Sequence, residues 1–266
     1  MTAAHSPSLD GKVAVVLGAG FGEDGIGNGA AIAITYARAG AQVIVADIVL
    51  DSARRTVDHI QGEGHAARAL PVDVTSAASL GSLAETVHQR HGPTSILHCN
   101  VGVTRMGSPP DLAEADWRLV LDTNLTGVFL ACQAFLPAMT AAGHGCVVTT
   151  SSLAAVKHTG YDYSAYYAAK AGLNQLTRTL GVQLAGTGVR VNAVMPGMID
   201  TPLIYRQISG AYASAEQMIA ERNRAVPMGR MGTVWEVAAA ALFLASDAAS
   251  YITGVCLPVD GGMSAQ

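Results

Sequence analysis

A tyrosine and a lysine stand four residues apart near the start of a helical pattern, in Tyr166-Tyr-Ala-Ala-Lys170. On a helix this spacing places both side chains on one face, about one turn apart. A free phenol, with a pKa of about 10, exchanges protons poorly near neutral pH, but a neighbouring ammonium group favours the phenolate. The pair could therefore serve as an acid and base toward an alcohol or carbonyl group. The same spacing also occurs in pairs that only support a helix, so the interpretation depends on companion residues.

A glycine-rich segment, residues 18–29, follows one apolar run and precedes a helical pattern. Glycines there allow a tight turn and let phosphate oxygens approach the backbone N–H groups at the start of a helix. The glycines concerned include Gly18, Gly20, Gly25 and Gly27. Asp47 ends the next apolar run, where a carboxylate accepts hydrogen bonds from ribose hydroxyls and repels a 2′-phosphate. Together they predict a dinucleotide site that prefers NAD, with NADP less favoured; singly, the loop could be a flexible turn and Asp47 a turn cap.

The elements that would hold these groups alternate along the whole chain. Apolar runs predict strands at 12–17, 42–46, 67–72, 95–99, 146–150, 189–194 and 255–259, and helical patterns lie at 27–39, 51–62, 76–91, 112–141, 164–185 and 233–246. Most strands are apolar throughout, so helices should cover both sheet faces. We therefore predict an α/β fold, a single-domain Rossmann-type doubly wound parallel sheet of about seven strands over residues 1–266. Residues 201–230 interrupt the alternation and are predicted to form a lid over the site.

The composition argues against several other classes of protein. Half of the 266 residues are hydrophobic, and the net charge of −4 gives no electrostatic footprint for nucleic acid or for an anionic membrane. The apolar runs have the length of strands, the N-terminal segment resembles no signal peptide, and the four cysteines contain no CxxC pair. We expect a cytoplasmic protein without a metal site, a disulfide framework, a membrane partner or a nucleic-acid partner.

Further motifs follow one another along the chain. In chain order they are the glycine loop ending Gly25-Ile26-Gly27, Asp73-Val74, Asn100-Val-Gly102, Thr123-Asn124-Leu-Thr-Gly127, Ser151-Ser152, Tyr166-x3-Lys170, Val191-Asn-Ala-Val-Met-Pro196-Gly197 and Asp260-Gly-Gly262. Each motif is common by itself, but their order and spacing are specific. With them the chain resembles the classical short-chain dehydrogenase/reductase family from about residue 10 to 262.

The resemblance implies hydride transfer between NAD and a secondary alcohol or ketone, in a homotetramer. Ser152 would hold the substrate oxygen, and Tyr166 would be the acid in ketone reduction and the base in alcohol oxidation. Lys170 would lower the tyrosine pKa and bind the nicotinamide ribose, while Asn124 would interrupt its helix to position a proton-relaying water. Cofactor contacts would also come from Gly18, Gly20, Gly25, Ile26, Gly27, Asp47, Asp73, Val74, Asn100, Gly102, Pro196, Gly197, Ile199 and Thr201. Outside this set of motifs, Ser152 could merely cap a strand end and Asn124 merely kink a helix.

Two departures from the family pattern keep alternatives open. The loop from Gly18 to Gly25 is longer than usual, which puts its phosphate contacts in doubt, and the segment from Ser152 to Tyr166 is one residue longer. Tyr163 stands seven residues before Lys170, a spacing that resembles enoyl-thioester reductases, in which it would serve the reduction of a carbon–carbon double bond. A third alternative is a non-catalytic nucleotide-binding regulator, although such a protein would be expected to have lost the serine, tyrosine or lysine.

The substrate cannot be identified from these patterns. Arg105, Lys157 and His158 fall on loops at the predicted ligand-binding edge, where they could meet a polar or anionic substrate group or could simply be solvated. The lid carries apolar side chains that could line a pocket or form a subunit contact. These are Leu203, Ile204, Tyr205, Met218 and Met228.

Overall fold

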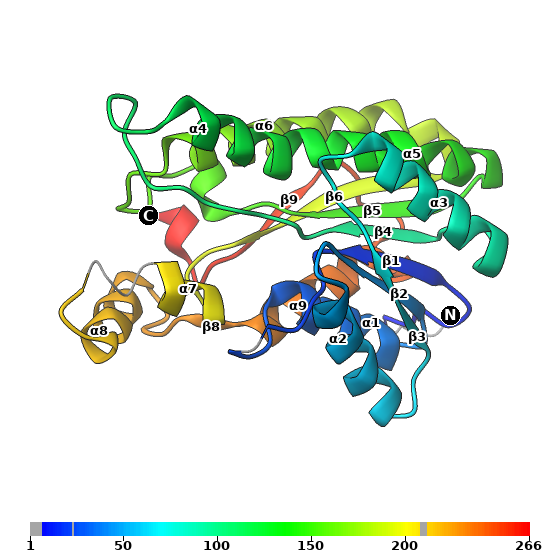
Figure 1. The fold of residues 1–266 in the computed structure, drawn as a ribbon, viewed down its shortest axis with the longest axis horizontal. Helices are drawn as coiled ribbons and strands as arrows, with labels where there is room; N and C mark the ends of the chain where they lie inside the picture. Colours follow the sequence, from blue (N-terminus) through cyan, green and yellow to red (C-terminus); the bar gives the residue numbers. More distant parts are fainter. Residues whose placement is uncertain (1–6, 23, 208–211) are drawn as a thin grey trace.

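A computed structural model describes residues 7–22, 24–207 and 212–266, and its centre is a parallel sheet of seven strands (Figure 1). The strand order is β3-β2-β1-β4-β5-β6-β9, which confirms the doubly wound arrangement. The strands are β1 (Val13–Leu17), β2 (Gln42–Asp47), β3 (Ala67–Pro71), β4 (Ile96–Cys99), β5 (Gly145–Thr150), β6 (Val189–Pro196) and β9 (Cys256–Val259). Two short strands, β7 (Ile199–Asp200) and β8 (Gly232–Thr233), pair with each other outside this sheet.

Helices cover both faces of the sheet (Figure 1). One layer holds α1 (Asn28–Arg38), α2 (Leu50–Gly62) and α9 (Val234–Ala245), and the other holds α3 (Ala77–His91), α4 (Glu114–Leu121), α5 (Gly127–Ala142) and α6 (Ser164–Gln183). Two shorter helices, α7 (Pro202–Gln207) and α8 (Ala215–Ala225), lie beyond the end of β6 and fall within the predicted lid. The layers explain why the strands are apolar throughout. In β1, Ala14 and Val16 belong to the core under α1 and α9, whereas Val13, Val15 and Leu17 belong to the core under α3 and α5.

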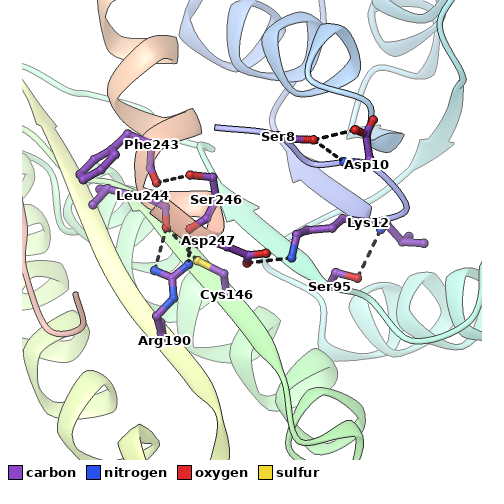
Figure 2. A network of polar contacts seen from close by, with 11 residues as sticks. Ser8, Asp10, Lys12, Ser95, Cys146, Arg190, Phe243, Leu244, Ser246 and Asp247 are labelled. Atoms are coloured by element: carbon purple, nitrogen blue, oxygen red, sulfur yellow. Dashed lines mark hydrogen bonds and ion pairs between the residues drawn. The ribbon is translucent and has the colours of Figure 1, made fainter. Parts of the chain in front are cut away.

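Polar contacts join the amino-terminal edge of the sheet to the carboxyl end of α9 (Figure 2). Arg190 at the start of β6 donates to the carbonyl oxygens of Leu244 and Ser246 at 2.8 and 3.1 Å, and Lys12 forms an ion pair with Asp247 at 2.9 Å. A cation at the carboxyl end of a helix satisfies carbonyl groups that have no partner inside the helix. These contacts join the end of α9 to β6 and to the segment before β1, at the edge of the sheet opposite the glycine-rich loop.

The predicted helix at 112–141 is interrupted. A π-helical segment, Asp122–Thr126, joins α4 to α5, so the backbone widens by one residue per turn at this point. Among the described residues, the run Glu114–Ala142 is the one helix long and apolar enough to cross a membrane by length and composition. That is weak evidence for a span, because a helix packed on a protein core passes the same test. Here α5 packs against α3, β4 and β5.

Candidate active site

A cleft of about 450 Å³ opens where β1, β4, β5 and β6 end. Parallel strands deliver their following loops to one edge, and ligands bind at such an edge in doubly wound sheets. Most of the predicted site residues line this cleft: Gly18, Gly20, Gly25, Gly27, Asp47, Asn100, Gly102, Ser152, Tyr166, Lys170, Pro196, Gly197, Ile199 and Thr201. The other predicted residues, Ile26, Asp73, Val74 and Asn124, stand outside its lining.

The glycine loop is shaped for close approach of a ligand to the backbone. Gly18 has a φ of +71°, and a Cβ there would lie 2.7 Å from Val101 Cγ2. A Cβ on Gly20 would lie 2.8 Å from Asp47 Oδ2, the same oxygen that accepts the Gly20 N–H at 2.9 Å. Side chains are therefore excluded from this part of the cleft. At the start of α1, the buried Asn28 Oδ1 has no hydrogen-bond partner among the described residues. Backbone bare of side chains at the start of a helix fits the phosphates of a nucleotide cofactor, and the unpaired amide oxygen can accept a hydrogen bond from a hydroxyl of such a ligand.

Asp47 stands at the end of β2 with both carboxylate oxygens directed at backbone groups. Oδ2 accepts from Gly20 and Oδ1 accepts from the Val49 N–H at 3.0 Å. The nearby Arg55 donates instead to the carbonyl oxygen of Phe21 and to Ser52 Oγ. The carboxylate thus lies fixed at the mouth of the cleft, and each of its oxygens keeps a free lone pair for a further donor.

Tyr166 and Ser152 meet at the end of β5. Ser152 follows the strand and caps the short 3-10 helix Leu153–Ala155, where its Oγ accepts the Ala154 N–H at 3.1 Å. Burial raises the pKa of Tyr166, and a hydrogen bond with Ser152 acts in the opposite direction. The pKa of Tyr166 is raised on balance, because removing the phenolate from water costs more free energy than the hydrogen bond with Ser152 recovers.

Lys170 lies one helical turn beyond Tyr166, as the spacing predicted. Its Nζ is 5.5 Å from the centre of the Tyr166 ring and donates to the Thr150 carbonyl oxygen at 2.9 Å. The side chain is 2% exposed, and burial lowers the pKa of Lys170 to about 8. The ammonium group of Lys170 therefore lies between β5 and α6, and its pKa of about 8 is close to neutral pH.

Asn124 occupies the centre of the π-helical segment, so the predicted helix interruption is confirmed. Its Nδ2 donates to the carbonyl oxygens of Val103 and Val120, each at 2.8 Å. Its buried Oδ1 has no partner in the described part of the chain. A Cβ on Gly102 would lie 2.9 Å from that Oδ1 and 3.6 Å from Lys170 Nζ. The amide oxygen and the ammonium group therefore face one small space.

The longer segment between Ser152 and Tyr166 folds over the helix start. Tyr167 holds it, because its hydroxyl accepts the Thr159 N–H at 2.9 Å and donates to the Tyr161 carbonyl oxygen at 3.0 Å. Tyr163 is buried and lines the cleft, with its ring centre 6.0 Å from that of Tyr166. Burial raises the pKa of Tyr163 to about 12. Tyr166, rather than Tyr163, has the hydrogen bond to Ser152.

The cations predicted for the substrate side lie elsewhere. Arg105 pairs with Asp116, Lys157 donates to the Met263 carbonyl oxygen and His158 stacks on Tyr167, and none of the three lines the cleft. Two arginines of the lid line it instead, Arg206 on α7 and Arg222 on α8. Arg222 is not among the residues predicted from the sequence, although one signal was available: it stands four residues after Met218, on the buried face of its helix.

Comparisons with known proteins show the family to which this chain belongs. The family model described as "Enoyl-(Acyl carrier protein) reductase" matches residues 20–264. The cis-4-hydroxycyclohexanecarboxylate dehydrogenase of Sinomonas cyclohexanicum is 40% identical over 256 residues, which cover 96% of this chain and 97% of that protein. A solved structure of a putative short-chain dehydrogenase/reductase from Burkholderia xenovorans is 41% identical and superposes with a TM-score of 0.94, covering 97% of this chain and 98% of the other. This chain belongs to the classical short-chain dehydrogenase/reductase family.

Membership in the short-chain dehydrogenase/reductase family makes the chain an oxidoreductase related to enzymes that act on alcohols. A further solved relative is a putative 2-deoxy-D-gluconate 3-dehydrogenase from Agrobacterium tumefaciens, with bound NADP. It is 35% identical, with a TM-score of 0.85, and the match covers 98% of this chain and 99% of that one. A nicotinamide cofactor is thus bound by a close structural neighbour of this fold.

Proposed function

We propose that this protein is an NAD-dependent dehydrogenase that interconverts a secondary alcohol and a ketone, with Tyr166 as the acid and base. The observation that carries the proposal is the meeting of Tyr166, Ser152 and Lys170 at the floor of the cleft beside the glycine loop. A phenol can exchange a proton with an oxygen that it touches, and the serine hydroxyl can hold that oxygen in place.

The proton path follows from the side chains themselves. Bound NAD would accept a hydride from the carbinol carbon and bring a positive charge close to the phenol. Tyr166 takes the hydroxyl proton of the alcohol, and Ser152 donates a hydrogen bond to the same oxygen. Lys170, with its pKa of about 8, stabilises the phenolate and hands a proton onward. The unpaired Oδ1 of Asn124 faces the same space as Lys170 Nζ and is placed to orient a water that carries this proton away.

We infer NAD rather than NADP from the charge at the ribose end of the cleft. Asp47 presents a carboxylate there, and a 2′-phosphate would meet it at close range. The side chain that follows, Ile48, is exposed and uncharged, whereas an NADP enzyme benefits from a cation at this place. Asp73 and Val74 remain candidates for adenine contacts, because their loop follows β3 directly beside the end of β2.

Enoyl-thioester reduction is the second candidate, favoured by the description of the matching family model and by the place of Tyr163 in the cleft wall. Under this alternative Tyr163 would donate the proton. The hydrogen bond between Ser152 and Tyr166 favours alcohol and ketone chemistry instead.

We also propose that residues 201–230 form the substrate lid and that the chain assembles as a homotetramer. Large apolar side chains remain exposed on the outer helices, with Trp117 and Phe129 on α4 and α5 and Val182 on α6. Such a surface is typical of a subunit interface. Sedimentation equilibrium of the purified protein would give the oligomeric state, and a monomer would contradict this part of the proposal.

The test of the activity uses the wild type and Tyr166→Phe, with Tyr163→Phe as the matched variant. Absorbance of the reduced nicotinamide is followed with NAD and NADP across alcohols, ketones and enoyl thioesters. We expect alcohol oxidation with NAD, a loss of several orders of magnitude in kcat for Tyr166→Phe with cofactor binding retained, and a modest effect of Tyr163→Phe. Turnover of enoyl thioesters alone, or full activity of Tyr166→Phe, would overturn the assignment.

A further inference from the structure

A buried arginine faces the substrate side of the cleft. Arg222 lies on α8, is 5% exposed and belongs to the cleft lining. It comes from the lid rather than from the sheet, and it packs beside a small apolar cluster of Ile204, Met218 and Met231. An arginine guanidinium remains charged at every physiological pH, so this wall of the cleft carries a permanent positive charge.

The described residues provide no carboxylate partner for this charge. Arg222 Nε donates to Met231 Sδ at 3.2 Å and Nη1 donates to the Tyr161 hydroxyl at 3.2 Å, and both acceptors are neutral. Within residues 7–22, 24–207 and 212–266, no Asp or Glu forms an ion pair with Arg222. The other arginines of the lid differ from it, because Arg206 pairs with Asp24, Arg230 pairs with Glu236, and Arg224 is exposed. Among the described lid arginines, Arg222 is therefore the one that is buried and forms no ion pair with a carboxylate.

Burying a charge without a counterion costs free energy, and an anionic ligand bound in the adjoining cleft would supply the counterion. The guanidinium has five N–H donors in a planar fork, and two of them have partners among the described residues, so donors remain there for a planar anion. A carboxylate matches the fork with two parallel hydrogen bonds. We propose that Arg222 binds a carboxylate of the substrate, so that the enzyme acts on hydroxy acids and the corresponding keto acids. This proposal rests on the alcohol dehydrogenase function proposed above.

Three tyrosines lie between Arg222 and the reacting groups on the wall of the cleft. The ring centres of Tyr166 and Tyr163 are 6.0 Å apart, and those of Tyr163 and Tyr161 are 5.5 Å apart. Arg222 contacts the hydroxyl of Tyr161 at one end of this series, and Tyr166 stands at the other end. This arrangement favours a substrate in which a ring or a chain of several bonds separates the carboxylate from the carbinol carbon.

Arg222 and Arg206 serve different parts of the cleft. Arg206 approaches the glycine loop, since its Nη2 would lie 3.5 Å from a Cβ on Gly22, and it already pairs with Asp24 in that loop. Arg222 lies on the tyrosine side. The cofactor phosphates belong with the glycine loop, so they do not account for the charge of Arg222.

The experiment compares a charged and an uncharged form of one substrate. The reduction of 4-oxocyclohexanecarboxylate and of its ethyl ester is measured with the wild type, Arg222→Met, Arg222→Lys and Arg224→Met. Arg224 is the matched control, because it lies exposed on the same helix and outside the cleft. For Arg222→Met we expect kcat/KM to fall about 100-fold with the acid and to change less than about threefold with the ester. Arg222→Lys should lose less of its kcat/KM with the acid than Arg222→Met does, and Arg224→Met should resemble the wild type with both substrates.

Equal losses with the acid and the ester would show that Arg222 only supports the lid and would overturn the proposal. A wild type that does not prefer the acid would overturn it without any variant. Calorimetric binding to the NADH-loaded protein covers the case in which no ketone is reduced, and the case in which Arg222→Met does not fold. Binding of cyclohexanecarboxylate but not of cyclohexanecarboxamide would then support the carboxylate site while the proposed reaction fails. Tighter binding of cyclohexylphosphonate than of the carboxylate would contradict the assigned anion.

Discussion

The buried ammonium group of Lys170 is predicted to lower the stability of the folded protein at neutral pH, so Lys170→Met should be more stable than the wild type. Burial lowers the pKa of Lys170 from its ordinary value of 10.5 to about 8. At about 1.4 kcal/mol for each pKa unit, burying the charged form costs about 3 kcal/mol. Methionine avoids this cost, but it also removes the hydrogen bond to the Thr150 carbonyl oxygen, which contributes about 1 kcal/mol. The net expectation is a gain of about 2 kcal/mol in the free energy of unfolding per subunit, with loss of activity.

The sign of the pH dependence makes this prediction specific. Below about pH 8 the lysine is protonated in both the folded and the unfolded state, so the full cost is present. Between about pH 8 and 10.5 the folded state releases its proton first, the unfolded state binds more protons, and the stability of the wild type rises relative to the variant. The advantage of Lys170→Met should therefore be largest near neutral pH and should fade toward about pH 10.5.

Urea unfolding followed by circular dichroism, at one protein concentration and at both ends of this pH range, measures the difference. Lys157→Met is the matched control, because Lys157 also donates to a backbone carbonyl oxygen, that of Met263, but it is only half-buried. Lys157→Met should leave the free energy of unfolding unchanged or lower it. If Lys170→Met proves less stable than the wild type at neutral pH, or if its advantage grows with pH, the desolvation argument for this lysine is wrong.

Three further variants test other parts of the cleft. Asp47→Ser should raise the KM for NAD about tenfold and lower the KM for NADP. The substitution removes the proposed acceptor for the ribose hydroxyls and the charge that would repel a 2′-phosphate. Initial rates measured with both cofactors check this expectation. Asn124→Leu should lower kcat at least about tenfold with little change in NADH binding, measured by fluorescence titration, since it removes the unpaired Oδ1 beside Lys170; an unchanged kcat would remove Asn124 from the proton path. Asp24→Asn breaks an ion pair with Arg206 in which both side chains are more than half exposed, so the melting temperature should shift by no more than the equivalent of about 1 kcal/mol.

The fold and most residues of the cleft could be predicted from the sequence, because helices and strands have regular geometry. A helix has a fixed pitch, so four residues between Tyr166 and Lys170 already place both on one face. Parallel strands all end at one edge, so the residues that follow β1, β4, β5 and β6 had to meet there. Apolar runs without alternation required a sheet covered on both faces, and the seven strands confirm that reading.

The solvation and the partners of the site side chains could not be predicted from the sequence. They depend on which groups tertiary packing removes from water and which it leaves unpaired. The pKa of Tyr166 is raised rather than lowered within the protein, because burial outweighs its hydrogen bond to Ser152. Arg105, Lys157 and His158 carry the right chemistry, but they pack against Asp116, Met263 and Tyr167 outside the cleft. Arg222 belongs to no motif, and its possible role follows only from the tertiary structure, in which α8 places it beside Tyr161 with no ion pair to a carboxylate among the described residues. Periodicity places a side chain on a face, whereas its solvation and its partners are decided by segments far apart in the chain.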